Sequence, residues 1–577
     1  MDSLKKIFYF AKFCGLKKFY LIIFFLIINS FLEILSIGSI PLFLSHLIGD
    51  SLNLNFFPFL NKIEPFILFY NLDTKFLFGF LIIFIFIIKN LFFLWFVIFQ
   101  NKFYVTLNSK ISNHLFSIYI NFNYEKIIKK NSNIYIRNII NECNLVVESL
   151  KSLVSICKES MILISLFFLL SFTINLSLTS GILVIFTFAS ILFYKIFKKK
   201  LNFASLKSQE TRGNQLKFIS DAIGANKEVK IFSLEKFIAS NFSKILEKRL
   251  YYEYIYSVIL NLPKIVFELV IIFILIILSY YYLTTFEFGY AITTLSLLTL
   301  ICLRLFPLFN LLTSSFAKVR ALKSSVDLVY KEFNDVILDS TPKQAELTSS
   351  LPFAKYIEMK NISYSYGKNE KIIENLNLKI LKGEKIGIMG DSGSGKSTFV
   401  NLFCGLLYPT KGEIIVDENN IVKNIKGWQS HISYVSQNNF LLDDTIKNNI
   451  IFGKKENEIV DENRIQNILK ILNLYNFVNR LELGIDTIVG QYGSLISGGQ
   501  KQRIGIARAI YSNREIIILD EATSNLDMTN ENHILDFLFN SHEMKNKTII
   551  IISHKKNSFQ FLKKVYKIKE KKIFINS

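Results

Sequence analysis

The sequence predicts a membrane protein of two parts, an all-α domain of six membrane-spanning helices followed by an α/β P-loop nucleotide-binding domain. Hydrophobic residues make up 51% of the 577 residues and aromatic residues 15%, and they are unevenly distributed. Long Leu, Ile and Phe runs dominate up to about Phe316, and an ordinary soluble α/β composition begins at about Tyr356. We therefore predict a membrane domain at residues 1–335, a linker at 336–355 and a nucleotide-binding domain at 356–577.

The apolar runs are long enough to cross a bilayer, which takes about 20 mostly apolar residues. Six stretches qualify, at residues 19–47, 76–100, 146–172, 176–197, 256–284 and 290–316. Basic residues gather in the segments after the second and the fourth stretch, whereas the opposite loops carry few. By the positive-inside rule the N-terminus is cytoplasmic, and an even number of spans places the nucleotide-binding domain on the same side.

The first outer loop, at about residues 49–75, mixes aromatic and aliphatic residues with Asn, Lys and Pro. Two interpretations remain open, an amphipathic helix on the outer leaflet and an apolar loop packed against the spans. The third and fourth spans meet at Thr173–Leu176, so we expect them to form a tight hairpin.

The net charge of +21 does not indicate a nucleic-acid partner. Much of the surplus lies beside the apolar runs, as expected for basic residues that face anionic lipid headgroups, and no nucleic-acid-binding motif accompanies it. The five cysteines, Cys14, Cys143, Cys157, Cys302 and Cys404, are scattered without a CxxC pair. This spacing predicts neither a disulfide framework nor a zinc site.

A phosphate-binding loop lies between a predicted strand and a predicted helix. The residues are Gly390, Asp391, Ser392, Gly393, Ser394, Gly395, Lys396, Ser397 and Thr398, which fit G-x-x-x-x-G-K-[ST]. Glycines let backbone N–H groups close around phosphate, and the helix N-terminus adds its positive dipole end. We expect Lys396 to reach the β- and γ-phosphates and Ser397 to bind Mg²⁺.

A second motif supplies the carboxylates that such a loop needs for hydrolysis. The apolar strand Ile516–Leu519 leads into Asp520 and Glu521. Asp520 at the end of a buried strand suits the magnesium shell, and Glu521 can take a proton from the attacking water. The sequence thus predicts ATP and Mg²⁺ at this site.

Between these motifs, Ile496 precedes Ser497, Gly498, Gly499 and Gln500, and this segment resembles the LSGGQ signature of ABC transporters. The resemblance covers about residues 350–570. It implies that Tyr366 stacks on adenine, that Gln437 contacts Mg²⁺, that Ser524–Asp527 is the D-loop and that His554 contacts the γ-phosphate. It also implies that the signature completes the ATP site of a partner subunit, so that the chain acts as a homodimer.

The chain departs from the family pattern at a few positions. Ile496 replaces Leu, Asn525 replaces the usual Ala, and Gln491 stands where exporters often carry Glu. Since Lys396, Glu521 and His554 are retained, the resemblance implies that both sites of a homodimer hydrolyse ATP. The replacement at Gln491 leaves the coupling to the membrane domain open.

Fusion of six spans to the ATPase resembles the exporter arrangement, whereas importers usually keep their permease on a separate chain. In exporters two cytoplasmic loops each carry a short coupling helix, which we expect at about residues 117–127 and 219–228.

Ionisable residues within the spans are candidates for a substrate cavity, because each costs about 2.5–3.5 kcal/mol on insertion scales. They are Glu33, Lys89, Lys264, Glu268 and Arg304. Mutual pairing is the alternative, since Glu268 lies one helical turn from Lys264. The surplus positive charge suits an anionic headgroup such as pyrophosphate.

The amino-acid sequence around these residues resembles that of bacterial flippases for lipid-linked oligosaccharides, although Lys264 stands where Arg is common. This resemblance implies a polyprenyl-pyrophosphate glycan as cargo, moved outward across a bacterial cytoplasmic (inner) membrane. A lipid A-type lipid or multidrug exporter and a peptide exporter remain the alternatives. The charge pattern alone does not separate them.

Overall fold

A computed structural model describes residues 2–13, 15–48, 74–173, 176–285, 288–338, 351–366, 370–453 and 458–576. It divides into two compact units, residues 1–122 with 126–339 and residues 123–125 with 340–577. The predicted outer loop at 49–75 lies almost wholly outside the described residues, as do residues 174 and 175 of the predicted hairpin.

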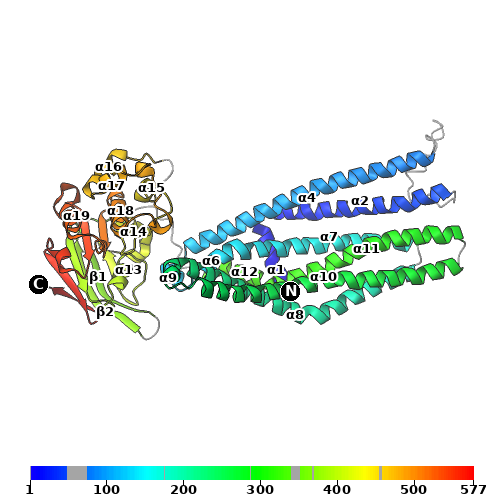
Figure 1. Ribbon diagram of the computed structural model, residues 1–577, viewed down its shortest axis with the longest axis horizontal. Helices are drawn as coiled ribbons and strands as arrows, with labels where there is room; N and C mark the ends of the chain where they lie inside the picture. The colour runs from blue at the N-terminus through cyan, green and yellow to red at the C-terminus, as the bar shows by residue number, and fades with distance from the viewer. Residues whose placement is uncertain are drawn as a thin grey trace. The chain divides into compact units, whose positions relative to one another are not determined.

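The first unit is built from long helices that lie side by side (Figure 1). They are α2 (Leu16–Ile48), α4 (Thr74–Ile120), α7 (Cys143–Thr173), α8 (Leu176–Gly224), α10 (Glu235–Thr285) and α11 (Phe288–Ala321). Each stretch proposed as a span from the sequence falls within one of these helices. Among the described residues, Leu16–Ile40, Gly79–Ile120 and Glu235–Thr285 are long and apolar enough to cross a membrane.

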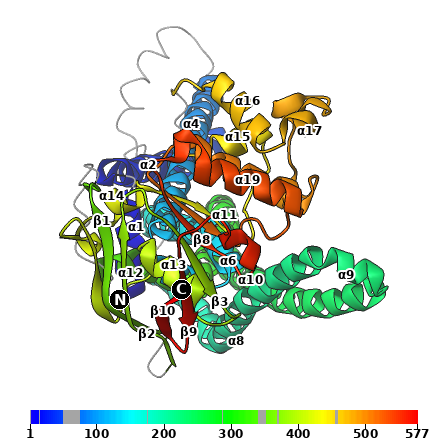
Figure 2. The ribbon, with the colours of Figure 1, turned by 90° about the vertical axis from the view of Figure 1, so that its left-hand side faces the viewer.

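Shorter helices surround the ends of the long ones. They are α1 (Asp2–Phe13), α5 (Tyr124–Ile128), α6 (Ser132–Arg137), α9 (Asn226–Ile231) and α12 (Lys323–Leu338), with one π-helical turn at Asn138–Glu142. Helix α9 lies at the end of the paired helices α8 and α10 (Figure 2). Helix α12 extends three residues beyond the predicted end of the membrane domain at residue 335.

The segments expected to carry coupling helices begin as continuations of long helices. Helix α4 runs to Ile120, and α5 follows at Tyr124; helix α8 runs to Gly224, and α9 follows at Asn226. Ile118 and Tyr119 are buried in the helical core, and this burial favours the extension of α4. The short helices therefore lie a few residues later in the chain than the centres of the predicted segments.

The second unit contains two sheets. An antiparallel sheet has the strand order β2-β1-β4-β5, and a largely parallel sheet has the order β10-β9-β3-β8-β7-β6. The strands are β1 (Tyr356–Tyr366), β2 (Glu370–Leu381), β3 (Lys385–Gly390), β4 (Lys411–Val416), β5 (Asn419–Asn420), β6 (Ile432–Val435), β7 (Ile516–Asp520), β8 (Thr548–Ile552), β9 (Lys564–Lys569) and β10 (Lys572–Asn576). The helices are α13 (Lys396–Phe403), α14 (Ile425–Gln429), α15 (Ile446–Ile450), α16 (Glu462–Ile471), α17 (Tyr475–Asn479), α18 (Gly498–Tyr511) and α19 (Met528–Asn540).

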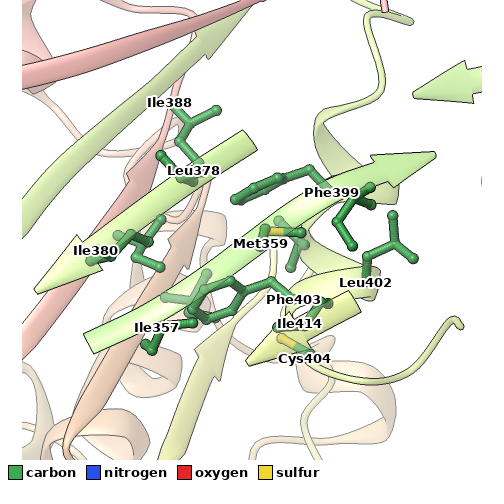
Figure 3. Packing of buried hydrophobic residues seen from close by; sticks show 14 of the residues in the cluster. Ile357, Met359, Leu378, Ile380, Ile388, Phe399, Leu402, Phe403, Cys404 and Ile414 are labelled. Atoms are coloured by element: carbon green, nitrogen blue, oxygen red, sulfur yellow. The ribbon is translucent and has the colours of Figure 1, made fainter. Parts of the chain in front are cut away.

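Helix α13 is held by the hydrophobic core of this unit. Phe399 and Phe403 on α13 pack against Ile357 and Met359 of the antiparallel sheet (Figure 3). The fully buried Trp428 donates its indole N–H to the backbone oxygen of Phe403 at 2.7 Å. This packing fixes the helix that follows the phosphate-binding loop.

The parallel strands bring the predicted motifs to one edge of the sheet. Strands β3, β8, β7 and β6 are neighbours and parallel, so their carboxyl ends meet at the same edge. Strand β3 ends at Gly390, β7 at Asp520, and β8 just before Ser553 and His554. Gln437 follows β6 at this edge.

Candidate active site

The phosphate-binding loop has the geometry that its glycines predict. Gly395 has a φ of 103° and precedes α13, a conformation that favours glycine. A Cβ on Gly390 would lie 2.5 Å from the Ser394 hydroxyl oxygen and 2.9 Å from the Ile568 carbonyl oxygen. Both positions therefore require glycine for the loop to close at the N-terminus of the helix.

The loop leaves polar groups for an anion. The Lys396 ammonium donates to the backbone oxygens of Gly390 and Asp391, at 2.7 and 3.0 Å. The Ser394 hydroxyl is buried without a hydrogen-bond partner. These groups and the N-terminus of α13 suit the phosphates of a nucleotide. Tyr366 lies at the end of β1 and pairs with Glu370 of β2. In the same strand β2, Ile372 lies so close to Gly395 that it would contact a Cβ at that position.

Three predicted catalytic side chains meet after the strand ends. The Gln437 amide nitrogen donates to one oxygen of Glu521 at 2.8 Å, and His554 Nδ1 lies 3.6 Å from the other. Glu521 has a φ of 51°, which costs energy for a residue other than glycine. This strained backbone directs the carboxylate between Gln437 and His554.

Asp520 is the buried carboxylate of the site. Burial raises the pKa of Asp520, and the adjacent Glu521 adds to the rise, while a hydrogen bond from the Tyr434 hydroxyl at 3.0 Å and the Lys396 ammonium oppose it. A buried acid whose ionised form is penalised in this way suits a divalent cation. Asp520, the Ser397 hydroxyl and the Gln437 amide oxygen are the hard oxygen ligands that Mg²⁺ prefers, so the donor set fits the ion.

The signature begins helix α18 through a capping box. The Ser497 hydroxyl accepts from the Gln500 backbone N–H at 3.3 Å, and the Gln500 side chain accepts from the Ser497 N–H at 2.8 Å. A Cβ on Gly499 would lie 3.2 Å from the backbone oxygen of Asn525. The signature therefore packs directly against the predicted D-loop.

Residues that the motifs do not include also position the site. Gln502, on the buried side of α18, donates to the Ser524 hydroxyl at 3.1 Å and accepts from the Asn525 backbone N–H at 2.9 Å. Lys555 donates to the Ser524 backbone oxygen at 3.1 Å. In the sequence, Gln502 could be recognised by its position as a polar residue on an otherwise apolar face of the helix.

We predict that Gln502→Met slows ATP hydrolysis without weakening ATP binding. The substitution keeps the volume of the buried side chain but removes both hydrogen bonds to the D-loop, each worth about 1 kcal/mol. We expect kcat to fall about tenfold, measured beside the Kd for ATP. The matched control is Gln560→Met, whose side chain donates to Asn532 and has no other hydrogen bond among the described residues. A fall in ATP affinity with unchanged kcat would contradict the prediction.

Three of the charged residues predicted in the spans come together in the helical unit. The Lys89 ammonium lies 2.9 Å from one carboxylate oxygen of Glu33, and Arg304 contacts the other. The side chain of Glu33 is 5% exposed and that of Arg304 45% exposed. Lys264 and Glu268 are both exposed, and among the described residues no ion pair joins them.

The sequence prediction omits the four charged residues of the third proposed span, which are Glu148, Lys151, Lys158 and Glu159. Glu159 on α7 is buried, and the Lys158 ammonium lies 3.5 Å from its carboxylate. Lys158 also lies 5.2 Å from the centre of the Phe93 ring. A search of the third stretch for charged positions finds this pair as readily as the others.

Comparisons with known proteins agree with this architecture. A sequence model described as "ABC transporter" matches residues 373–524. An ATP-dependent lipid A-core flippase of Desulfotalea psychrophila is 37% identical over 241 residues, 41% of each chain. One from Francisella novicida is 31% identical over 392 residues, 65% of this chain and 63% of that protein. ATP-binding cassette sub-family B member 5 of Mus musculus is 42% identical over 202 residues, 34% of this chain.

The chain spans less than two thirds of each of these relatives, down to 16% of the mouse protein. The fold comparison extends further. A bacterial Atm1-family ABC exporter solved with ATP bound superposes with a TM-score of 0.77 at 18% identity, over 97% of this chain and 95% of that one. This match confirms the predicted fold class. With the phosphate-binding loop, the signature and the paired sheets in place, residues 373–524 are similar to the ATPase domain of ABC transporters, and the chain has the fold of an ABC exporter.

Proposed function

We propose that the chain is half of a homodimeric, ATP-driven flippase that moves an anionic lipid-linked oligosaccharide, a polyprenyl-pyrophosphate glycan, from the inner to the outer leaflet of a bacterial cytoplasmic membrane. In this proposal the six long helices span the membrane, and the N-terminus and ATPase domain lie in the cytoplasm. The cluster of Glu33, Lys89 and Arg304 carries the proposal, because it sets two cations against one carboxylate inside the helical unit.

The ATPase step follows from the side chains at the strand ends. Glu521 takes a proton from water, whose oxygen attacks the γ-phosphorus while the bond from that phosphorus to the ADP oxygen breaks. Gln437 and His554 hold the Glu521 carboxylate from either side. Lys396 would bind the phosphates. Mg²⁺ held by Ser397, Asp520 and Gln437 would neutralise charge that develops on the phosphate oxygens.

Pairing of two copies is supported by the surface around the signature. Leu495 is 73% exposed and Tyr492 is 62% exposed, and they lie two and five residues before Ser497. Large apolar side chains beside a polar motif are typical of an interaction surface. A second copy would cover them and bring its signature to the phosphate-binding loop of the first.

The charge cluster supports an anionic cargo. Its net charge is positive by one unit, and the half-exposed guanidinium of Arg304 offers planar donors of the kind that bind phosphate oxygens in pairs. An uncompensated charge within a membrane is costly and is typical of substrate sites. A neutral hydrophobic drug would not require it.

A lipid A-type lipid is the second candidate cargo. The names of two of the relatives, ATP-dependent lipid A-core flippases, favour it. Lipid A-type lipids and polyprenyl-pyrophosphate glycans both present phosphate groups, so the charge cluster suits either. The two candidates differ in the lipid chain and the sugar, which binding and transport assays separate.

The test uses the purified full chain in liposomes. ATPase stimulation and translocation are measured for a polyprenyl-pyrophosphate glycan, for lipid A and for a hydrophobic dye. We expect the glycan to stimulate turnover and to move, and Lys89→Gln to reduce both more than Lys17→Gln does. Movement of lipid A alone would favour the second candidate, and movement of the dye alone would overturn both.

A further inference from the structure

Glu531 is a charged residue on a helix face that is otherwise apolar. It lies near the start of α19, and the other buried residues of that helix are Ile534, Leu535, Leu538 and Phe539. Glu531 belongs to none of the motifs described above, although it is only 5% exposed. A buried carboxylate is costly to remove from water, and a well-packed apolar side chain in its place is often at least as stable. The groups that this carboxylate holds explain its presence better than stability does.

The Glu531 carboxylate is held by three side chains. One oxygen accepts hydrogen bonds from the Thr523 hydroxyl and from the Ser558 hydroxyl, both at 2.8 Å. The other oxygen lies 3.6 Å from the Lys555 ammonium. Thr523 and Ser558 are themselves buried. Because hydrogen bonds to an ionised group are stronger than neutral ones and gain further from low surrounding polarity, these groups fix one another firmly.

The three side chains come from two loops of the catalytic edge. Strands β7 and β8 are parallel neighbours whose last residues are paired. The segment after β7 contains Thr523 and the predicted D-loop, and the segment after β8 contains His554, Lys555 and Ser558. Glu531 therefore joins the D-loop to the loop that carries His554.

The contacts continue from Glu531 to the reacting groups. The Ser553 hydroxyl lies 3.2 Å from that of Ser558. Ser553 directly precedes His554, whose Nδ1 lies 3.6 Å from a carboxylate oxygen of Glu521. At the other end, the D-loop packs against the signature. An unbroken set of contacts thus leads from the signature through Glu531 to His554.

We infer that Glu531 is a positioning residue, which holds the loop after β8 so that His554 stays beside Glu521. Because it acts through His554, its loss should slow ATP hydrolysis and leave ATP binding unchanged. A carboxylate that only stabilised the domain would change both or neither. The inference rests on the ATP hydrolysis of the proposed function but not on its cargo.

The first experiment compares kcat for ATP hydrolysis with the Kd for ATP in the purified full chain, without cargo. Glu531→Gln keeps the shape of the side chain and removes its charge. We expect kcat to fall about tenfold, as for the loss of a hydrogen bond to a charged group, and the Kd to stay unchanged. Asp536→Asn is the matched control, because this carboxylate is exposed on the same helix and accepts from Asn540; it should hydrolyse ATP normally. Equal losses in kcat and in ATP affinity would overturn the inference.

A double-mutant cycle shows whether Glu531 acts through His554. Residual hydrolysis in the His554→Ala background is measured with radiolabelled ATP. Adding Glu531→Gln there should lower it no further, since no histidine remains to be positioned. The same loss in both backgrounds would show that the two residues act independently, and the inference would then fail.

A pair of conservative variants tests the link itself and does not depend on hydrolysis. Thr523→Val removes the hydroxyl that donates to Glu531 and keeps the size of the side chain, whereas Thr523→Ser keeps the hydroxyl. Hydrogen–deuterium exchange of residues 553–558 is measured without ATP. We expect faster exchange in Thr523→Val and not in Thr523→Ser, and equal exchange in the two variants would overturn the inference.

The exchange measurement also decides the question if Glu531→Gln fails to fold. It separates this inference from the proposed function as well. Failed glycan transport, or a chain that does not hydrolyse ATP, would count against the proposed function and leave the exchange result standing.

Discussion

Glu521→Gln is expected to lower the rate of ATP hydrolysis by a factor of about 10² to 10⁴, the usual contribution of a general base. The carboxylate lies between the Gln437 amide and His554, and a glutamine there retains the shape but cannot take the proton from water. Steady-state release of phosphate from the purified chain measures the effect. ATP binding should be retained, since no phosphate-binding group is altered.

The variant should therefore accumulate as a closed, ATP-bound dimer, which size-exclusion chromatography or cross-linking detects. Glutamine tolerates the φ of 51° about as well as glutamate does, so backbone strain does not change between the two. Glu482→Gln, an exposed carboxylate of the same domain, is the matched control and should hydrolyse ATP normally. Unimpaired turnover in Glu521→Gln would show that another group accepts the proton.

Glu33→Gln is expected to destabilise the helical unit by about 3 kcal/mol, as removal of one partner of a buried ion pair does. The substitution leaves the Lys89 and Arg304 cations beside each other without a negative charge. Thermal unfolding of the detergent-purified chain can be followed with a thiol-reactive dye, because Cys143 and Cys302 are buried in this unit. We expect a fall of several degrees in Tm.

A double variant separates the charge effect from simple loss of packing. Glu33→Gln/Lys89→Gln returns the cluster to a net charge of one, so it should recover at least half of the lost Tm. Glu268→Gln is the control, because this exposed carboxylate has no ion pair among the described residues. A double variant less stable than Glu33→Gln would show that the ion pair does not carry the stability.

The strand, loop and helix that carry the phosphate-binding motif could be placed from the sequence because the motif is local. The strand Lys385–Gly390, the loop and the helix at Lys396 are consecutive in the chain, so spacing alone places them. The chemistry of phosphate binding also restricts which residues can occupy each position. The roles of Gln502 and Tyr434 could not be predicted in this way. Gln502 contacts Ser524 of the predicted D-loop and Tyr434 contacts Asp520, and both contacts join segments that are far apart in the sequence.

The helical unit shows the limit of such reasoning. Hydrophobicity marks where long helices occur, but it does not say which helix faces which. Helical spacing suggested Lys264 and Glu268 as a pair, whereas Glu33 of α2 pairs with Lys89 of α4 and Arg304 of α11. The choice of partner depends on tertiary packing, which places α2 against α4 and α11.

Helices α8 and α10 are long enough that a small tilt about one end displaces the other end by many ångströms. With 49 and 51 residues, they are about 74 and 76 Å long at 1.5 Å per residue, more than twice the thickness of a bilayer core. A rigid rod of that length that tilts by about 10° about one end moves its other end by about 13 Å. A small angular change within the bilayer is thus amplified at α9, the short helix that joins the far ends of the two rods.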